Sequence, residues 1–217
     1  MRTKLPSGTP VELAFPDQPA TRGVVVIPDI GGLRPLFDEL AARLAHDYGW
    51  AVGAFEPFPG QELPTIESRF AAVPALTDER LIGDAEATAD LLGTPRVAII
   101  GFCMGGMYAY KAAASGRFDR AVPFYGMIRI PDDWKGSGHR DPLDSLAAEG
   151  ASPVLSIIGG RDPYTPAEDV AALADLPHVN PVVYPEAGHG FVHDASRDSH
   201  RADDAADAWR RVAEFLA

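Results

Sequence analysis

Five short apolar runs that lack apolar–polar alternation constrain the fold of this chain most strongly. Each has glycine or proline at or beside its end, and the runs are residues 23–29, 51–57, 96–101, 121–126 and 153–160. Strands that are covered on both faces in a parallel sheet have this pattern, because neither face meets water. The runs therefore predict a mostly parallel β-sheet buried between helices.

Segments with helical spacing separate these runs, which indicates an alternating order of strands and helices. The expected helices are residues 35–48, 78–92, 104–115, 167–176 and 203–217, and residues 11–15 and 181–186 are expected to form two further strands. Strand and helix in alternation are typical of a doubly wound α/β domain. We predict one such domain over residues 1–217, since the chain is too short for two ordinary domains.

The charge balance restricts the partners. The chain has 19 basic and 31 acidic residues, a net charge of −12 and no cluster of lysine or arginine, so it should repel nucleic acid and anionic membranes. No apolar stretch is long enough for a signal peptide or a membrane span, which predicts a cytoplasmic protein. A monomer is the first expectation, with a dimer as the alternative.

Cys103 is the only cysteine and lies in the stretch "GFCMGG", between an expected strand and an expected helix. Gly-x-Cys-x-Gly in this context predicts a nucleophile elbow, in which Gly101 and Gly105 avoid collisions around a strained turn. The helix N-terminus would favour a thiolate there. The alternative is a small buried hydrophobic residue, which is the commoner role of a lone cysteine. The flanking glycines favour the nucleophile.

Two further residues complete a possible catalytic set. Asp162 in "GGRDPYTP" and His189 in "EAGHGF" each follow an expected strand, in the order nucleophile, acid, histidine that α/β-hydrolases use. Alone, Asp162 would be a turn residue and His189 a loop histidine. A metal site would need His189, His193 and His200 with Asp194, but the glycines around His189 prevent a helix that would align them, so no metal is expected.

These motifs resemble the dienelactone hydrolase family of α/β-hydrolases. The resemblance rests on "GFCMGG", "GGRDPYTP", "EAGHGF" and "VIPDIGG", and it extends from about residue 11 to the last expected helix. It implies a compact α/β-hydrolase without a large cap domain. It also implies hydrolysis of a small ester or lactone through a thioester acyl-enzyme, without a metal or organic cofactor.

Carried over residue by residue, the resemblance gives each motif a role. Cys103 matches the nucleophile, His189 the base and Asp162 the acid that orients it, while the backbone N–H groups of Met104 and Ile30 match the oxyanion hole. The small-molecule substrate is expected to be an ester or lactone, including one that carries a carboxylate.

The expected substrate-binding residues are Asp29, Arg69, Tyr125, Phe191 and His193. The resemblance gives three of them a role. Asp29 lies where the family has a glutamate that accepts the thiol proton. Arg69, with Arg80 as its competitor, matches one arginine that binds a substrate carboxylate, and His193 occupies the position of the second. Loops at residues 56–64 and 134–143, which follow strand ends, are expected pocket walls.

Two other functions are compatible with these residues. The fold could carry a non-catalytic sensor that binds a ligand or oxidises Cys103, although a sensor needs neither Asp162 nor His189. It could also carry a hydrolase that acts on an unrelated ester. A panel of dienelactones and neutral aryl esters, with Cys103→Ala as the control, would separate these functions.

Overall fold

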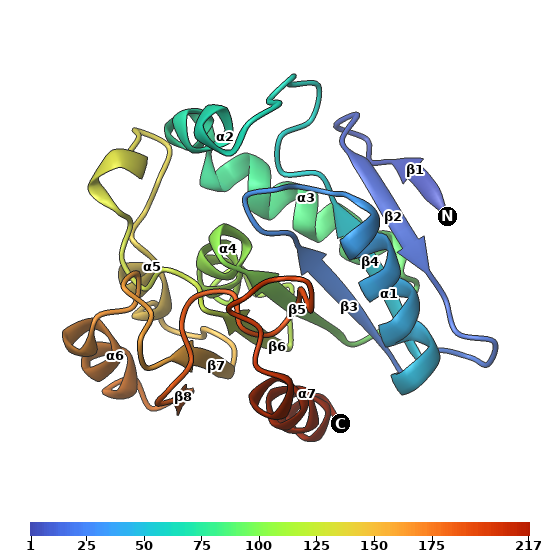
Figure 1. Ribbon diagram of the computed structural model, residues 1–217. Coiled ribbons are helices and arrows are strands. Elements are labelled where there is room, and N and C mark those ends of the chain that lie inside the picture. Colours follow the sequence, from blue (N-terminus) through green and yellow to red (C-terminus); the bar gives the residue numbers. More distant parts are fainter.

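An eight-stranded β-sheet runs through the computed structural model, which describes residues 1–217 (Figure 1). Its strand order is β1-β2-β4-β3-β5-β6-β7-β8, with β1 and β2 antiparallel to their neighbours and the other six strands parallel. The strands are β1 (Arg2–Lys4), β2 (Pro10–Ala14), β3 (Arg22–Ile27), β4 (Trp50–Phe55), β5 (Val97–Phe102), β6 (Arg120–Phe124), β7 (Val154–Gly159) and β8 (Val179–Tyr184).

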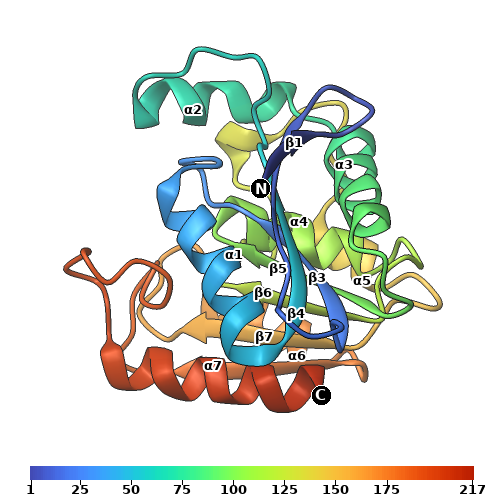
Figure 2. The same cartoon turned by 90° about the vertical axis from the view of Figure 1, so that its right-hand side faces the viewer.

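Helices cover both faces of this sheet, and Figure 2 shows α1 and α3 on its opposite sides. One apolar core of 27 residues lies under α1 (Pro35–Tyr48) and α7 (Ala202–Leu216). A second core of 35 residues lies under α3 (Asp78–Leu91), α4 (Met104–Ala112), α5 (Pro142–Leu146) and α6 (Ala167–Ala174). Two buried faces explain why the central strands are apolar throughout. None of the helices has the length and apolar composition that a membrane crossing requires.

The α/β prediction is confirmed, and the seven predicted strands appear with ends shifted by at most two residues. One strand and two helices were not predicted from the sequence: β1, α2 (Ile66–Ala72) and α5. Every residue of β1 is exposed, and α2 has no buried residue. Hydrophobic periodicity reports burial, so β1 and α2 leave no such signal. Helix α5 buries Pro142, Ser145 and Leu146, but its five residues are too few to show a helical period.

The parallel strands direct their carboxyl ends to one edge of the sheet, where the functional loops gather. The loops after β3, β5, β7 and β8 carry Asp29, Cys103, Asp162 and His189 respectively. The short helix α2 and the 3₁₀ turn η2 (Asp132–Trp134) add side chains to the same pocket. Ligands bind at this edge in open α/β sheets.

Candidate active site

Cys103 forms the whole turn between β5 and α4, because β5 ends at Phe102 and α4 begins at Met104. Its φ of 56° and ψ of −117° are a strained conformation for a residue with a side chain, which costs on the order of 1–3 kcal/mol. Two backbone hydrogen bonds hold it: the Cys103 N–H donates to the Phe124 carbonyl at 3.0 Å, and its carbonyl accepts from the Met107 N–H at 3.0 Å. The thiol is therefore fixed at the N-terminus of α4.

The two glycines of the elbow are required by close backbone packing. A Cβ atom at Gly101 would lie 2.0 Å from the Gly105 carbonyl oxygen, and one at Gly105 would lie 2.2 Å from the Ile27 carbonyl oxygen. Both distances are far below van der Waals contact. Strand β5, the elbow and the neighbouring strand β3 can therefore meet only without side chains at these positions.

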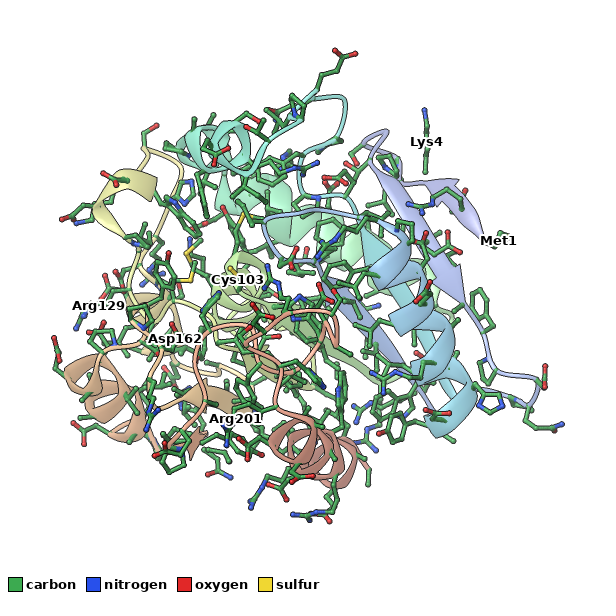
Figure 3. The ribbon with its side chains drawn as sticks, viewed as in Figure 1. Met1, Lys4, Cys103, Arg129, Asp162 and Arg201 are labelled. Carbon is green, nitrogen blue, oxygen red and sulfur yellow. The ribbon has the colours of Figure 1, made fainter.

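Asp162 and His189 form a hydrogen-bonded pair beside this turn. Figure 3 labels Cys103 and Asp162. The Asp162 side chain is fully buried; its Oδ1 accepts the Tyr164 N–H at 2.9 Å, and its Oδ2 lies 2.8 Å from Nδ1 of His189. A carboxylate only accepts, so His189 Nδ1 carries the proton. This tautomer leaves Nε2, which is buried and has no protein partner, as the atom that exchanges protons.

The charges around His189 favour its protonated form. Burial alone would lower the pKa of His189, but the bond to Asp162 and the adjacent Cys103 sulfur outweigh it and raise this pKa to about 10. The imidazolium then stands beside the thiol across the neutral pH range. A neighbouring positive charge stabilises a thiolate, so the pair suits a sulfur nucleophile with a proton donor next to it.

Cys103 and His189 line the same small cavity of about 150 Å³. The other lining residues are mostly apolar: Asp29, Ile30, Ile66, Phe70, Met127, Trp134, Tyr164 and Arg197. Trp134 comes from the predicted wall at residues 134–143, whereas residues 56–64 contribute nothing to the lining. The sequence interpretation missed five lining residues, Ile66, Phe70, Met127, Tyr164 and Arg197. An aromatic residue in a loop after a strand end was a signal that could have found Tyr164.

Two backbone N–H groups are available near the thiol. Met104 is the first residue of α4, so its N–H has no carbonyl one turn earlier in the helix. The N–H of Ile30 lies in the loop after β3 and donates to no protein atom, and Ile30 lines the cavity. Free backbone donors of this kind, one of them at a helix N-terminus, can stabilise a developing oxyanion.

Asp29 lines the cavity, and each of its two carboxylate oxygens already accepts two hydrogen bonds from the protein. Its Oδ1 accepts from the Gly31 N–H at 2.9 Å and from Arg34 at 2.6 Å, while its Oδ2 accepts from Arg34 at 2.9 Å and from His193 at 2.8 Å. Burial raises the pKa of Asp29, but the bonds from His193 and Arg34 outweigh it and hold the pKa well below its usual range. Asp29 is thus a fixed negative charge in the pocket wall.

His193 continues this network into the core, which corrects the expectation that it meets the substrate. Its side chain is fully buried; Nε2–H donates to Asp29, and Nδ1 accepts from the Tyr125 hydroxyl. Burial, the largest effect, lowers the pKa of His193. Tyr125 and Phe191 are also fully buried, with ring centroids 5.8 Å apart, and neither lines the cavity. These three side chains support the wall from behind.

The expected carboxylate-binding arginines lie outside the cavity lining. Arg69 is 3.4 Å from the Ile30 carbonyl oxygen and stands over the Phe58 ring, and Arg80 pairs with Asp84 at 3.1 Å. Arg197 is the only lysine or arginine in the lining. Its side chain is 41 % exposed, and its Nε is 3.8 Å from an Asp194 carboxylate oxygen, so the guanidinium retains free donors toward the cavity.

Comparison with known proteins gives the chain a family. The dienelactone hydrolase family model matches residues 10–217. The chain belongs to the dienelactone hydrolase family.

Similar family members are ester or lactone hydrolases. A carboxymethylenebutenolidase of Pseudomonas putida is 28 % identical over 212 residues, which cover 89 % of this chain and 84 % of that protein. A Bradyrhizobium protein named as a 2-oxo-3-(5-oxofuran-2-ylidene)propanoate lactonase is 28 % identical over 221 residues, 94 % and 88 % of the two chains. A structure described as a Klebsiella pneumoniae dienelactone hydrolase superposes with a TM-score of 0.84 at 25 % identity, covering 99 % and 96 %. This chain is accordingly an ester or lactone hydrolase with the α/β-hydrolase fold.

Proposed function

We propose that this hydrolase cleaves a small ester or lactone through a thioester on Cys103, with His189 and Asp162 as the other members of a catalytic triad. One observation carries the proposal: a thiol in a strained turn at a helix N-terminus shares a cavity with a histidine whose other nitrogen is held by a buried carboxylate. This is the arrangement of nucleophile, base and orienting group that acyl transfer requires.

In acylation, the Cys103 thiolate attacks the carbonyl carbon, and the electron pair of the C=O π bond moves to oxygen. The N–H groups of Met104 and Ile30 donate to this oxyanion. The intermediate then re-forms C=O and breaks the ester C–O bond. The leaving oxygen takes the proton from His189 Nε2, while Asp162 holds the imidazole in its tautomer. For a lactone, the alcohol stays attached to the acyl group.

In deacylation, neutral His189 Nε2 accepts a proton from water as the water oxygen attacks the thioester. Collapse of the second intermediate breaks the C–S bond and releases a carboxylic acid with the Cys103 thiolate. His189 is left protonated, so the enzyme returns to its starting state. The whole cycle uses side chains, two backbone N–H groups and water, and the proposed partner is the small-molecule substrate alone.

Asp29 acts in this proposal as a positioning residue instead of a mobile base. Any movement of the Asp29 carboxylate toward the thiol would break its hydrogen bonds with the Gly31 N–H, Arg34 and His193. A carboxylate fixed in the wall keeps the adjacent Ile30 N–H in place for the oxyanion. The thiol proton goes to His189, which has the free Nε2.

A trapping experiment tests the proposal. Rapid quenching with an activated acetate ester should give a protein heavier by one acetyl group, mapped to Cys103, the only thiol of the chain. Cys103→Ala should lose about a thousandfold or more in kcat, and His189→Ala should abolish the turnover of the acetyl-enzyme. An acetyl group on a serine, or full activity of Cys103→Ala, would refute the mechanism.

A further inference from the structure

A second hollow adjoins the catalytic cavity, and the two share three aromatic side chains. The outer hollow has a volume of about 340 Å³ and is lined by Phe70, Ala71, Pro131, Asp133, Trp134 and Tyr164. Phe70, Trp134 and Tyr164 also line the inner cavity, so one continuous apolar path leads outward from Cys103.

The aromatic residues on this path are exposed to a degree that the fold does not require. Phe70 and Tyr164 are 36 % and 47 % exposed, and Ile66, one helical turn before Phe70, is 45 % exposed. Helix α2 has no buried residue, so its apolar face is not part of either core. The ring of Phe70 lies 5.8 Å from that of Trp134, with 32° between the planes. A flat aromatic group could join this pair.

The sizes of the two hollows decide what each can hold. An apolar cavity of about 150 Å³ holds a molecule of the size of benzene, and the inner cavity has that volume. A small acyl group with the reacting carbonyl fills it. Any larger substituent must extend into the outer hollow, whose only charged lining residue is Asp133, an acid. The outer hollow is therefore suited to a neutral apolar group.

Tyr164 indicates which side of the ester occupies the outer hollow. Its ring packs edge-on against His189, at 5.0 Å between centroids and 70° between planes. The leaving oxygen must be within reach of His189 Nε2 to take its proton. A substituent on that oxygen starts beside Tyr164 and follows it outward, whereas the acyl group is directed away from His189.

We propose that the outer hollow is a subsite for a neutral aromatic group on the alcohol side of the substrate, so that the enzyme prefers arylmethyl or aryl esters to simple alkyl esters. This inference rests on the proposed function, since it needs His189 as the proton donor to the leaving group. The substrate then spans the path from Cys103 to Pro131, with its ring beside Phe70 and Trp134.

A pair of isomeric esters tests the assignment. Benzyl acetate and methyl phenylacetate have the same composition, but the ring is on the alcohol side in the first and on the acyl side in the second. The wild-type protein should have the larger kcat/KM for benzyl acetate. Trp134→Ala should lower the ratio of the two kcat/KM values about tenfold, which corresponds to about 1.4 kcal/mol. An unchanged ratio, or a ratio that rises, would overturn the proposal.

Two further variants keep the test independent of the buried Trp134 side chain. Ala71 is exposed and lines only the outer hollow, so Ala71→Trp fills this hollow without touching the inner cavity and should also lower the ratio. Phe15→Ala removes an exposed aromatic residue, 50 % accessible, that lines neither hollow, and it should leave the ratio unchanged. A fall of equal size in Phe15→Ala would refute the subsite.

A binding measurement separates failure of the subsite from failure of the proposed chemistry. In the Cys103→Ala protein, which cannot form the thioester, 2-naphthylmethanol should bind, and adding Trp134→Ala should weaken its Kd about tenfold. Absence of ester hydrolysis in the wild type with this binding intact would refute the proposed function but support the subsite. Equal Kd values in the two proteins would overturn the subsite even if the thioester forms.

Discussion

Replacing Asp29 with asparagine should destabilise the protein by removing one acceptor from a fully used carboxylate. Asparagine keeps one oxygen, which can still accept from the Gly31 N–H and from one nitrogen of Arg34. Its amide nitrogen then takes the place of Oδ2 and faces two donors, Arg34 at 2.9 Å and His193 Nε2 at 2.8 Å. His193 could switch its tautomer to accept this bond, but Nδ1 would then donate to Tyr125, whose buried hydroxyl would lose its acceptor.

The magnitude follows from the burial of the partners. Removing one member of a buried ion pair typically costs about 3–5 kcal/mol. Here Asp29 is 3 % exposed but Arg34 is 31 % exposed, so water partly solvates the unpaired guanidinium. We therefore expect a loss of about 2–4 kcal/mol in the free energy of unfolding. For a chain of this size, such a loss lowers Tm by roughly 5–15 °C.

The assay is urea unfolding at pH 7, followed by tryptophan fluorescence. The midpoint should fall while the slope with urea stays unchanged, because the unfolded surface is the same. Asp38→Asn is a matched control: Asp38 also pairs with an arginine, Arg2 at 2.7 Å, but the pair is solvent-exposed. This control should change stability by at most about 0.5 kcal/mol. An equally small loss in Asp29→Asn would refute the reasoning.

The pH dependence gives a second check on the same variant. The folded-state pKa of Asp29 is lowered, because the bonds from His193 and Arg34 outweigh burial. Its contribution to stability is therefore complete above the unfolded pKa, about 3.9, and is lost as the pH falls toward the folded value. The stability difference between wild type and Asp29→Asn should shrink below about pH 4. A difference that grows on acidification would contradict the lowered pKa.

Three further predictions concern the pocket and the elbow. Alkylation of Cys103 by iodoacetamide at pH 6 should slow about tenfold or more in His189→Ala. The reason is that the raised pKa of His189, about 10, keeps an imidazolium beside the sulfur in the wild type. Identical pH–rate curves for the two proteins would contradict this role. Arg197→Ala should lower kcat/KM for a carboxylate-bearing lactone about fivefold, as expected for a partly exposed ionic contact worth about 1 kcal/mol. A neutral lactone and Arg69→Ala are its controls, and a larger loss in Arg69→Ala would reverse the assignment. Gly105→Ala should abolish cooperative unfolding or soluble expression, since the alanine Cβ would lie 2.2 Å from the Ile27 carbonyl oxygen of β3. A fully stable Gly105→Ala protein would refute the required close packing.

Features with a local cause could be predicted from the sequence. The elbow at Cys103 could be predicted because its two glycines stand at fixed spacing around the cysteine, although only Gly101 packs against residues near in sequence and Gly105 packs against the distant Ile27. The location of Asp162 and His189 at one edge of the sheet could be predicted because both residues follow apolar strands, and parallel strands end on the same side of a sheet. The sequence therefore predicted the relative positions of the proposed catalytic residues without any knowledge of distances.

The partners of Asp29 and His193 could not be predicted in this way. These two residues are 164 positions apart, and Tyr125, the other partner of His193, is 68 positions away from it. An apolar pattern shows that a segment is buried but not which polar groups meet inside. His193 was therefore expected to contact the substrate, because the resemblance placed it at the position of the second arginine, although burial lowers its pKa and both of its nitrogens form hydrogen bonds inside the protein.

The loop between β8 and α7 explains why the second of the two expected carboxylate-binding positions was assigned to His193, four residues before Arg197, whereas the first was assigned to Arg69. Outside helices and strands, the direction of a side chain depends on turn dihedrals, which have no sequence period. Gly190 has a φ of +76°, and a Cβ there would lie 2.6 Å from a guanidinium nitrogen of Arg197. The glycine thus makes the turn and also leaves the space that Arg197 occupies. His193, between them, points into the core because Asp29 and Tyr125 supply its hydrogen bonds there.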